Sequence, residues 1–191
     1  GFGLSYTTFE VEPLTAEEKD GEIRIGVCVT NTGTLAGKEV VQVYYGAPAG
    51  KLGKPARQLI AFRKTRLLQA GEAQRMQLSF SVKDMASYDD LGKVKKAAWL
   101  LEKGTYAFYV GTSVRDAGKL DYTWTAGEDM VVRQLESRLV PSSLKKRMLA
   151  DGSFEELPQG VPCDPDANEL ERMPVEMMEA FAPALRARDR Y

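Results

Sequence analysis

The residues of this chain that could do chemistry are its carboxylates, because the sequence contains no histidine. Two carboxyl groups about 5–9 Å apart can cleave a glycosidic bond, one as general acid and the other as nucleophile or base. The sequence has many acidic residues, among them pairs such as Asp89-Asp90, Glu155-Glu156 and Asp164/Asp166. Adjacent residues of a strand point to opposite sides of a sheet, so such pairs favour a solvated surface over a catalytic centre. We therefore assign no catalytic residue.

The missing histidine also excludes several other kinds of site. Serine and cysteine nucleophiles activated by histidine cannot be built, and neither can zinc sites with histidine ligands. The glycine-rich stretches lack the lysine of a phosphate-binding loop, and the acidic residues lack the spacing of a calcium loop. The sequence therefore predicts no cofactor and no metal.

Exposed aromatic side chains would be needed if the chain bound a sugar. The reasonable pool is Tyr44, Tyr45, Tyr122 and Trp124. Alternation along a strand places Tyr44 and Tyr45 on opposite faces, so we expect one of them to be exposed. Trp99 and Trp124 are more simply explained as core or inter-strand residues than as sugar-stacking ones.

The segment 46–56 is the longest irregular stretch in the first two thirds of the chain. Its glycines and prolines are incompatible with regular structure, and loops of this length are often functional. Lys51 and Lys54 lie in it and, with the aromatic residues, are candidates for contact with a sugar or with a neighbouring domain. The alternative is a mobile crossing between two sheets.

The elements that must position these residues are strands. Ile23, Ile25, Val27 and Val29 alternate with less apolar residues, which is the period of a half-buried strand. Asn31 and Gly33 tolerate a left-handed backbone, so we expect a turn there and a hairpin with the valine-rich strand that follows. Strand-like segments recur at 4–12, 22–31, 38–46, 57–67, 73–82, 96–101, 104–112 and 119–126. Their number and short spacing predict an all-β antiparallel sandwich.

Two local patterns complete the expected fold. Gly104-Thr105-Tyr106 is typical of a tyrosine corner, in which the phenol bonds back to the preceding turn. The first part of the tail is expected to be extended over 129–139 and then to form a short helix from Ser142 or Ser143 to about Asp151. Residues 157–168 are expected to act as a linker, and residues 168–181 to form a second amphipathic segment. The predicted organisation is a sandwich over 1–126 and a partly helical tail or linker over 127–191.

Composition limits the partners and the setting. The hydrophobic content of 43% and the charged content of 28% are those of a globular protein, and the net charge of −1 argues against nucleic acid. No apolar run is long enough to span a membrane. Two cysteines, Cys28 and Cys163, make no disulfide framework, and no N-glycosylation sequon occurs, which favours a reducing cytoplasmic setting. The chain starts without Met inside a motif, so we expect a piece of a longer protein.

Several blocks of sequence resemble one known family. They are Gly1 to Phe9, Val27 to Gly33 with Ala36 to Tyr44, Pro55 to Phe62, Ala70-Gly71-Glu72, Asp84 to Asp89, and Glu102 to Asp116. In this order and spacing they resemble the fibronectin type III-like domain of glycoside hydrolase family 3, the β-glucosidases and their relatives. The resemblance implies an immunoglobulin-like, fibronectin type III-like β-sandwich in a parent that hydrolyses β-glycosides.

The same resemblance implies where the catalysis takes place. In that family the nucleophilic aspartate lies in a (β/α)8 barrel and the acid/base usually comes from an α/β sandwich domain, and this chain resembles neither. Those two domains are the implied partners. The segment from Ser143 to Ser153 resembles the connecting segment of a subset with permuted domain order, in which the barrel follows the sandwich.

Three functions remain open on the sequence. The first is a structural module that packs against catalytic domains and fixes their positions. The second is a carbohydrate-binding module, which would show a flat strip of exposed aromatic rings. The third, an independent enzyme, is opposed by the lack of histidine and of any catalytic motif. A broad exposed apolar patch would favour the first function over the second.

Overall fold

The computed structural model describes residues 5–135, 145–149 and 151–156. Within these ranges the chain is built from strands and one short 3-10 helix, η1 (Val82–Met85). Among the described residues no helix is long and apolar enough to cross a membrane. The predicted all-β class is confirmed.

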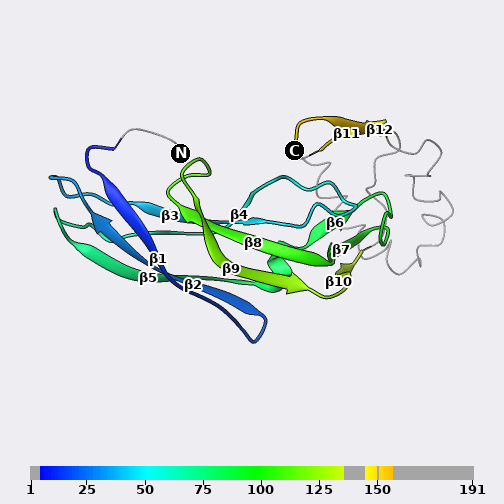
Figure 1. Cartoon of the computed structure of the whole chain (residues 1–191), viewed down its shortest axis with the longest axis horizontal. Helices are drawn as coiled ribbons and strands as arrows, with labels where there is room; N and C mark the ends of the chain where they lie inside the picture. Colours follow the sequence, from blue (N-terminus) through cyan, green and yellow to red (C-terminus); the bar gives the residue numbers. More distant parts are fainter. Residues whose placement is uncertain (1–4, 136–144, 150, 157–191) are drawn as a thin grey trace, which may run out of the picture.

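Two antiparallel sheets face each other as the layers of a sandwich (Figure 1). The first contains, in spatial order, β1 (Phe9–Lys19), β2 (Glu22–Asn31) and β5 (Ala73–Ser81). The second contains β4 (Gln58–Lys64), β3 (Val40–Gly46), β8 (Gly104–Gly111) and β9 (Gly118–Ala126). This is the antiparallel sandwich that the spacing of the strands predicts.

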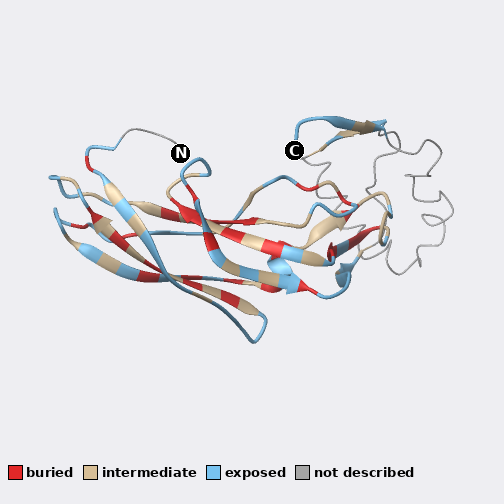
Figure 2. Cartoon of the chain, in the orientation of Figure 1, coloured by how far each residue is buried: buried red, intermediate tan, exposed pale blue. Residues whose placement is uncertain are grey.

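The core lies between the inner faces of the two sheets (Figure 2). Each strand contributes alternate residues, as the pleat requires. The fully buried or nearly buried members are Ile23, Ile25, Val27 and Val29 of β2, Val41, Val43 and Tyr45 of β3, Met76, Leu78 and Phe80 of β5, and Tyr106, Phe108 and Val110 of β8. The inward face expected for β2 is confirmed.

The expected hairpin between residues 22–31 and 38–46 is wrong. β2 pairs with β1 and β5, whereas β3 pairs with β4 and β8, so the segment between β2 and β3 crosses from one sheet to the other. Asn31 anchors the crossing, because its side chain accepts from the Thr7 hydroxyl at 2.7 Å and donates to the Leu68 carbonyl at 3.0 Å. Gly33 is needed for close packing, not for a left-handed backbone, since a Cβ there would lie 2.1 Å from the Thr7 hydroxyl.

The first strand runs further than expected. β1 continues to Lys19 and forms a hairpin with β2 across a turn at Asp20 and Gly21, both of which have positive φ. Its register shifts between Pro13 and Thr15, which accommodates the proline in an edge strand. The proline and the charged residues after it explain why the sequence pattern ended near residue 12.

A smaller sheet closes one end of the sandwich, at the right of Figure 1. It contains β10 (Met130–Gln134), β7 (Ala98–Leu101) and β6 (Ser87–Asp89), in that order. The extended conformation expected for 129–139 is confirmed over β10, and β6 was not expected. The boundary at residue 126 stays a prediction.

Beyond β10, the described part of the tail is a hairpin of β11 (Lys146–Met148) and β12 (Phe154–Glu156). The short helix expected from Ser142 or Ser143 to Asp151 is therefore wrong over these residues. A turn with Gly152 at φ +84° joins the two strands, and the Ser153 amide donates to the Asp151 carboxylate at 2.9 Å. The linker 157–168 and the segment 168–181 lie outside the described residues.

Candidate interaction surfaces

In each acidic pair of the described chain, one residue has a structural role: Asp89 in the first and Glu155 in the second. Asp89 is fully buried, and its two carboxylate oxygens accept the amides of residues 92, 93, 94 and 95 at 2.7–3.0 Å. It therefore folds the loop between β6 and β7 around itself. Glu155 is bonded to Arg147 and Lys93. The pair Asp164/Asp166 lies outside the described residues.

No arrangement of described side chains forms a metal site, since no group of three or more cysteine, aspartate or glutamate residues comes together there. The Cys28 thiol is free and half-buried, and Cys163 lies outside the described ranges.

The loop 46–56 is held by one buried carboxylate. Glu102, only 3% exposed, accepts the Lys51 amide at 2.5 Å and pairs with the Lys54 ammonium at 2.5 Å. Lys54 is itself only 8% exposed, so this candidate contact residue is committed to an internal ion pair. Gly50 makes room for the carboxylate, because a Cβ there would lie 2.4 Å from it. The loop is an ordered part of the fold.

The β11–β12 hairpin docks on this loop (Figure 1). The Arg147 guanidinium donates to the Lys51 carbonyl at 2.9 Å and bonds to Glu155, which also accepts from the Lys93 ammonium at 2.8 Å. The hydrogen bond from Lys93 is the main cause that lowers the pKa of Glu155; burial opposes it, and the hydrogen bond and charge of Arg147 add to the lowering. Lys51 is exposed at the rim of a hollow of about 380 Å³ between loop and hairpin.

The two tyrosines proposed for sugar contact are both buried. Tyr44 is 7% exposed and Tyr45 is 3% exposed, so the expectation that one of them faces solvent is wrong. Tyr44 lies on the outer face but directly between Leu59 of β4 and Tyr109 of β8. Tyr45 lies in the core, where burial raises the pKa of its phenol to about 12.

The two tryptophans, both in the described part of the chain, do not form a flat strip with their aromatic neighbours. Trp124 is half-buried against Tyr106, with ring centroids 5.4 Å apart in an edge-on arrangement. Trp99 is 41% exposed, so it is not a core residue, and its ring lies 5.6 Å from that of Tyr88 at an angle of 47°. This cross-strand pair is tilted, whereas a sugar-stacking platform requires coplanar rings.

The tyrosine corner expected at residues 104–106 is confirmed. The Tyr106 hydroxyl donates to the Glu102 carbonyl at 3.1 Å, and burial is the main reason that its pKa rises to about 12.

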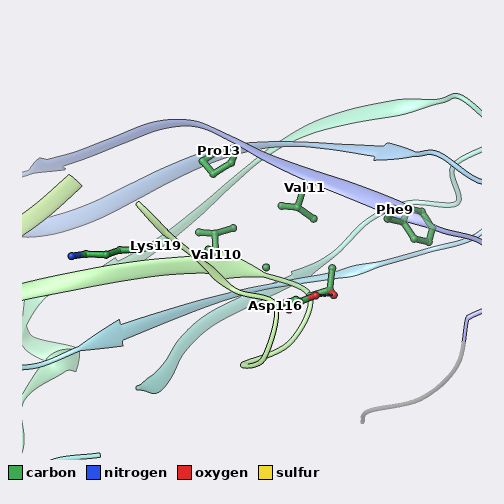
Figure 3. Close-up of a pocket in the computed structure, with 9 residues that line it drawn as sticks. Phe9, Val11, Pro13, Val110, Asp116 and Lys119 are labelled. Carbon is green, nitrogen blue, oxygen red and sulfur yellow. Dashed lines mark hydrogen bonds between the residues drawn. The ribbon is translucent and has the colours of Figure 1, made fainter. Parts of the chain in front are cut away.

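A groove of about 410 Å³ opens between β1 and the β8–β9 pair (Figure 3). It is lined by Phe9, Val11, Pro13, Val110, Gly111, Thr112, Asp116, Gly118 and Lys119. Burial alone would raise the pKa of Asp116, but hydrogen bonds from Thr112 and Ser113 outweigh it and lower the pKa. Asp116 thus stabilises the turn in which it lies. The groove lies where β1 of the first sheet meets β8 and β9 of the second.

The largest exposed apolar residues of the second sheet lie on its edge strand, β4. Phe62 is 70% exposed and Leu59 is 50% exposed. They line a shallow hollow of about 560 Å³ together with Val40, Gln42, Arg63 and Lys64. Phe62 and Leu59 lie in the strand predicted over 57–67, but their exposure was not predicted, because a sequence pattern does not show which strand lies at an edge.

Comparison with known families identifies the sandwich. Residues 39–114 match the family model described as the fibronectin type III-like domain. The chain is 51% identical to "Beta-glucosidase A" of Butyrivibrio fibrisolvens over 212 aligned positions, which cover all of this chain and 25% of that protein. This chain carries the fibronectin type III-like domain of glycoside hydrolase family 3.

Two further β-glucosidases also match this chain over a small part of their own length. A β-glucosidase of Kluyveromyces marxianus is 42% identical over 61% of this chain and 13% of its own length. The crystal structure of a β-glucosidase from Paenibacillus barengoltzii superposes on 83% of this chain with a TM-score of 0.72 and 42% identity, and the match covers 19% of that chain. This chain thus spans a quarter or less of the length of each of these relatives, and it matches an accessory part of them.

Proposed function

We propose that this chain is a non-catalytic structural domain of a β-glucosidase, and that it packs against a (β/α)8 barrel and an α/β sandwich domain of the same polypeptide. The observation that carries the proposal is the match of this chain to a quarter or less of each β-glucosidase reported above. The fold supports it, because Asp89, Glu102 and Glu155 are engaged in internal bonds and the core is filled by its own side chains.

The tail supports a finer proposal about domain order. The match to the Butyrivibrio fibrisolvens protein extends over the whole chain, whereas the match to the Kluyveromyces marxianus protein covers 61% of it. We propose that residues 127–191 connect the sandwich to a barrel that follows it, as in the permuted subset of the family.

The test compares the 191-residue chain with a longer polypeptide that contains it. We expect the chain alone to leave an aryl β-glucoside and cellobiose intact, and the longer polypeptide to hydrolyse them. Cleavage by the chain alone would overturn the non-catalytic assignment, and an inactive, folded longer polypeptide would overturn the β-glucosidase assignment.

A sugar titration of the same 191-residue chain tests the carbohydrate-binding alternative. Sugar contact by Tyr44, Tyr45, Lys51, Lys54 and Trp124 stays a prediction of that alternative. An NMR titration of the labelled chain with cellobiose at millimolar concentration is expected to leave the amide signals unchanged. Localised shifts near Trp124, or near the tilted pair of Tyr88 and Trp99, would favour binding over a purely structural role.

A further inference from the structure

We propose that the hollow on the edge strand β4 is the docking surface of this domain, and that it receives an apolar side chain flanked by carboxylates from the catalytic part of the same polypeptide. We call it the β4 surface, lined by Val40, Gln42, Leu59, Phe62, Arg63 and Lys64. The inference rests on the proposed function, because that function supplies the partner.

The first argument is the exposure of apolar groups on a strand edge. β4 is the outermost strand of its sheet and has one hydrogen-bonded neighbour, β3. Phe62 lies across from Gln42 and is 70% exposed, while Leu59 lies across from Tyr44 and is 50% exposed. β4 has the charges and the bulge with which proteins usually protect such edges, at Arg63, Lys64 and the register shift opposite Val43 and Tyr44, yet Phe62 and Leu59 remain exposed beside them. Exposed apolar surface beside an open strand edge marks an interaction site.

The second argument is the charge around the hollow. The only charged residues that line it are Arg63 and Lys64. The Arg63 guanidinium is held at the rim, where it donates to the Gln77 carbonyl of β5 at 3.1 Å. Among the described residues no carboxylate forms an ion pair with either cation. The complementary surface must therefore bring negative charge to an apolar centre.

The same charges argue against a second copy of the chain as occupant. A two-fold axis would place each β4 surface opposite an identical one, so that the cations of Arg63 and Lys64 would face like charges. A partner of different composition avoids this repulsion. In a polypeptide as long as the Butyrivibrio fibrisolvens relative, three quarters of the chain lies outside this one, and it supplies such a partner.

The test is hydrogen–deuterium exchange of the longer polypeptide against the 191-residue chain. We expect the amides of residues 58–64 to exchange about tenfold more slowly in the longer polypeptide, because docking must open before they exchange. Phe62→Asp should abolish this difference, and Leu14→Asp, at a 43% exposed apolar residue of β1, should leave it unchanged. Circular dichroism of each variant establishes that it is folded.

Each outcome decides a separate point. Equal exchange at residues 58–64 in an active longer polypeptide would overturn the β4 surface and leave the proposed function intact. Protection at β4 in a polypeptide without glucosidase activity would overturn the proposed function and support the surface. Sedimentation should show the isolated chain as a monomer, and a dimer that Phe62→Asp dissociates would show that a second copy is the occupant and overturn the proposal.

Discussion

Glu102 joins two features of the fold that are separate in sequence. Its carboxylate binds the loop 46–56 through the Lys51 amide and the Lys54 ammonium, and its carbonyl accepts the hydroxyl of Tyr106. A charge this deeply buried is tolerated only when it is paired and hydrogen-bonded. The loop and the corner at the start of β8 therefore depend on the same residue.

The first prediction concerns this buried pair. Lys54→Met should lower the free energy of unfolding by about 3 kcal/mol or more, because it leaves the Glu102 carboxylate buried without its cation. The matched control is Lys146→Met, which breaks the exposed pair with Glu156 and should change stability by less than about 1 kcal/mol. Urea denaturation measures both, and equal losses in the two variants would contradict the prediction.

The second prediction concerns the buried phenols. Burial is the main cause that raises the pKa values of Tyr45 and Tyr106 to about 12 from the ordinary 10.0. The stability they contribute is fully present below pH 10 and is lost as the pH rises towards 12. The melting temperature should therefore fall over this interval, and the tyrosinate absorbance of these two phenols should appear together with unfolding.

Tyr45→Phe provides the control for this titration. It should remove one late-titrating phenol and leave the other, at small cost, since the Tyr45 hydroxyl makes only a long bond of 3.4 Å to the Met85 carbonyl. Ionisation of all tyrosines while the chain is still folded would contradict the raised pKa values of Tyr45 and Tyr106.

At the residue scale, alternation predicted the core face but not every exposed position. Alternation correctly places Tyr45 on one face of β3 and Tyr44 on the other, yet both side chains are buried. The outer face of β3 is covered at Tyr44 by its neighbours on β4 and β8. Cross-strand neighbours come from segments far away in sequence, so a single strand could not reveal this.

At the element scale, the β11–β12 hairpin has two different sides. Arg147 and Glu155 face the sandwich and carry its polar bonds, while the neighbouring cross-strand pair Met148 and Phe154 is 62% and 65% exposed. Isolated two-stranded hairpins are marginal in water, so the polar contacts to the loop are what hold this one in place.

The third prediction follows from these contacts. Glu155→Gln should detach the hairpin from the sandwich, seen as loss of the distinct NMR signal of the Arg147 side-chain Nε–H. The low pKa of Glu155 means that docking is constant above its ordinary value of 4.5 and is lost as the pH falls below it. Glu156→Gln is the matched control, because that carboxylate meets only exposed Lys146, and an identical effect would contradict the prediction.

The same hairpin shows what the sequence pattern missed. Asp151-Gly152 is a common hairpin turn, but the apolar residues before it are also spaced as on a short helix. A helix of so few residues has little stability of its own, and Arg147 gains bonds to Lys51 and Glu155 in the extended form. These bonds are tertiary, so the local pattern favoured the wrong element.

At the scale of the whole molecule, the small sheet ties the chain beyond residue 126 to the sandwich. Val132 of β10 packs against the main core, and Val131 pairs with Leu100 of β7. The strands of the two large sheets, the core face of β2 and the tyrosine corner could be predicted because alternation and local turn chemistry determine them, whereas β6, β11 and β12 were not predicted. The crossing between β2 and β3 could not, because the turn at Asn31 does not specify the sheet that the next strand joins.

The fourth prediction tests the boundary at residue 126. A chain ending at residue 128 lacks β10 and should melt several degrees lower than a chain ending at residue 135, because the edge of β7 and part of the core become exposed. Differential scanning calorimetry measures the difference. Equal melting temperatures would support a domain that is complete at residue 126.

The pairing of distant strands has a consequence for biosynthesis. Glu22 at the start of β2 pairs with Ser81 at the end of β5, so the first sheet cannot close until the later strand has been made. At a translation rate of roughly 5–20 residues per second, about 60 residues take ~3–12 s. Throughout that interval the valine-rich strands β2 and β3 lie outside any finished sheet. A ribosome-bound nascent chain of this protein is therefore a substrate for chaperones until residue 111, the end of β8, has left the exit tunnel.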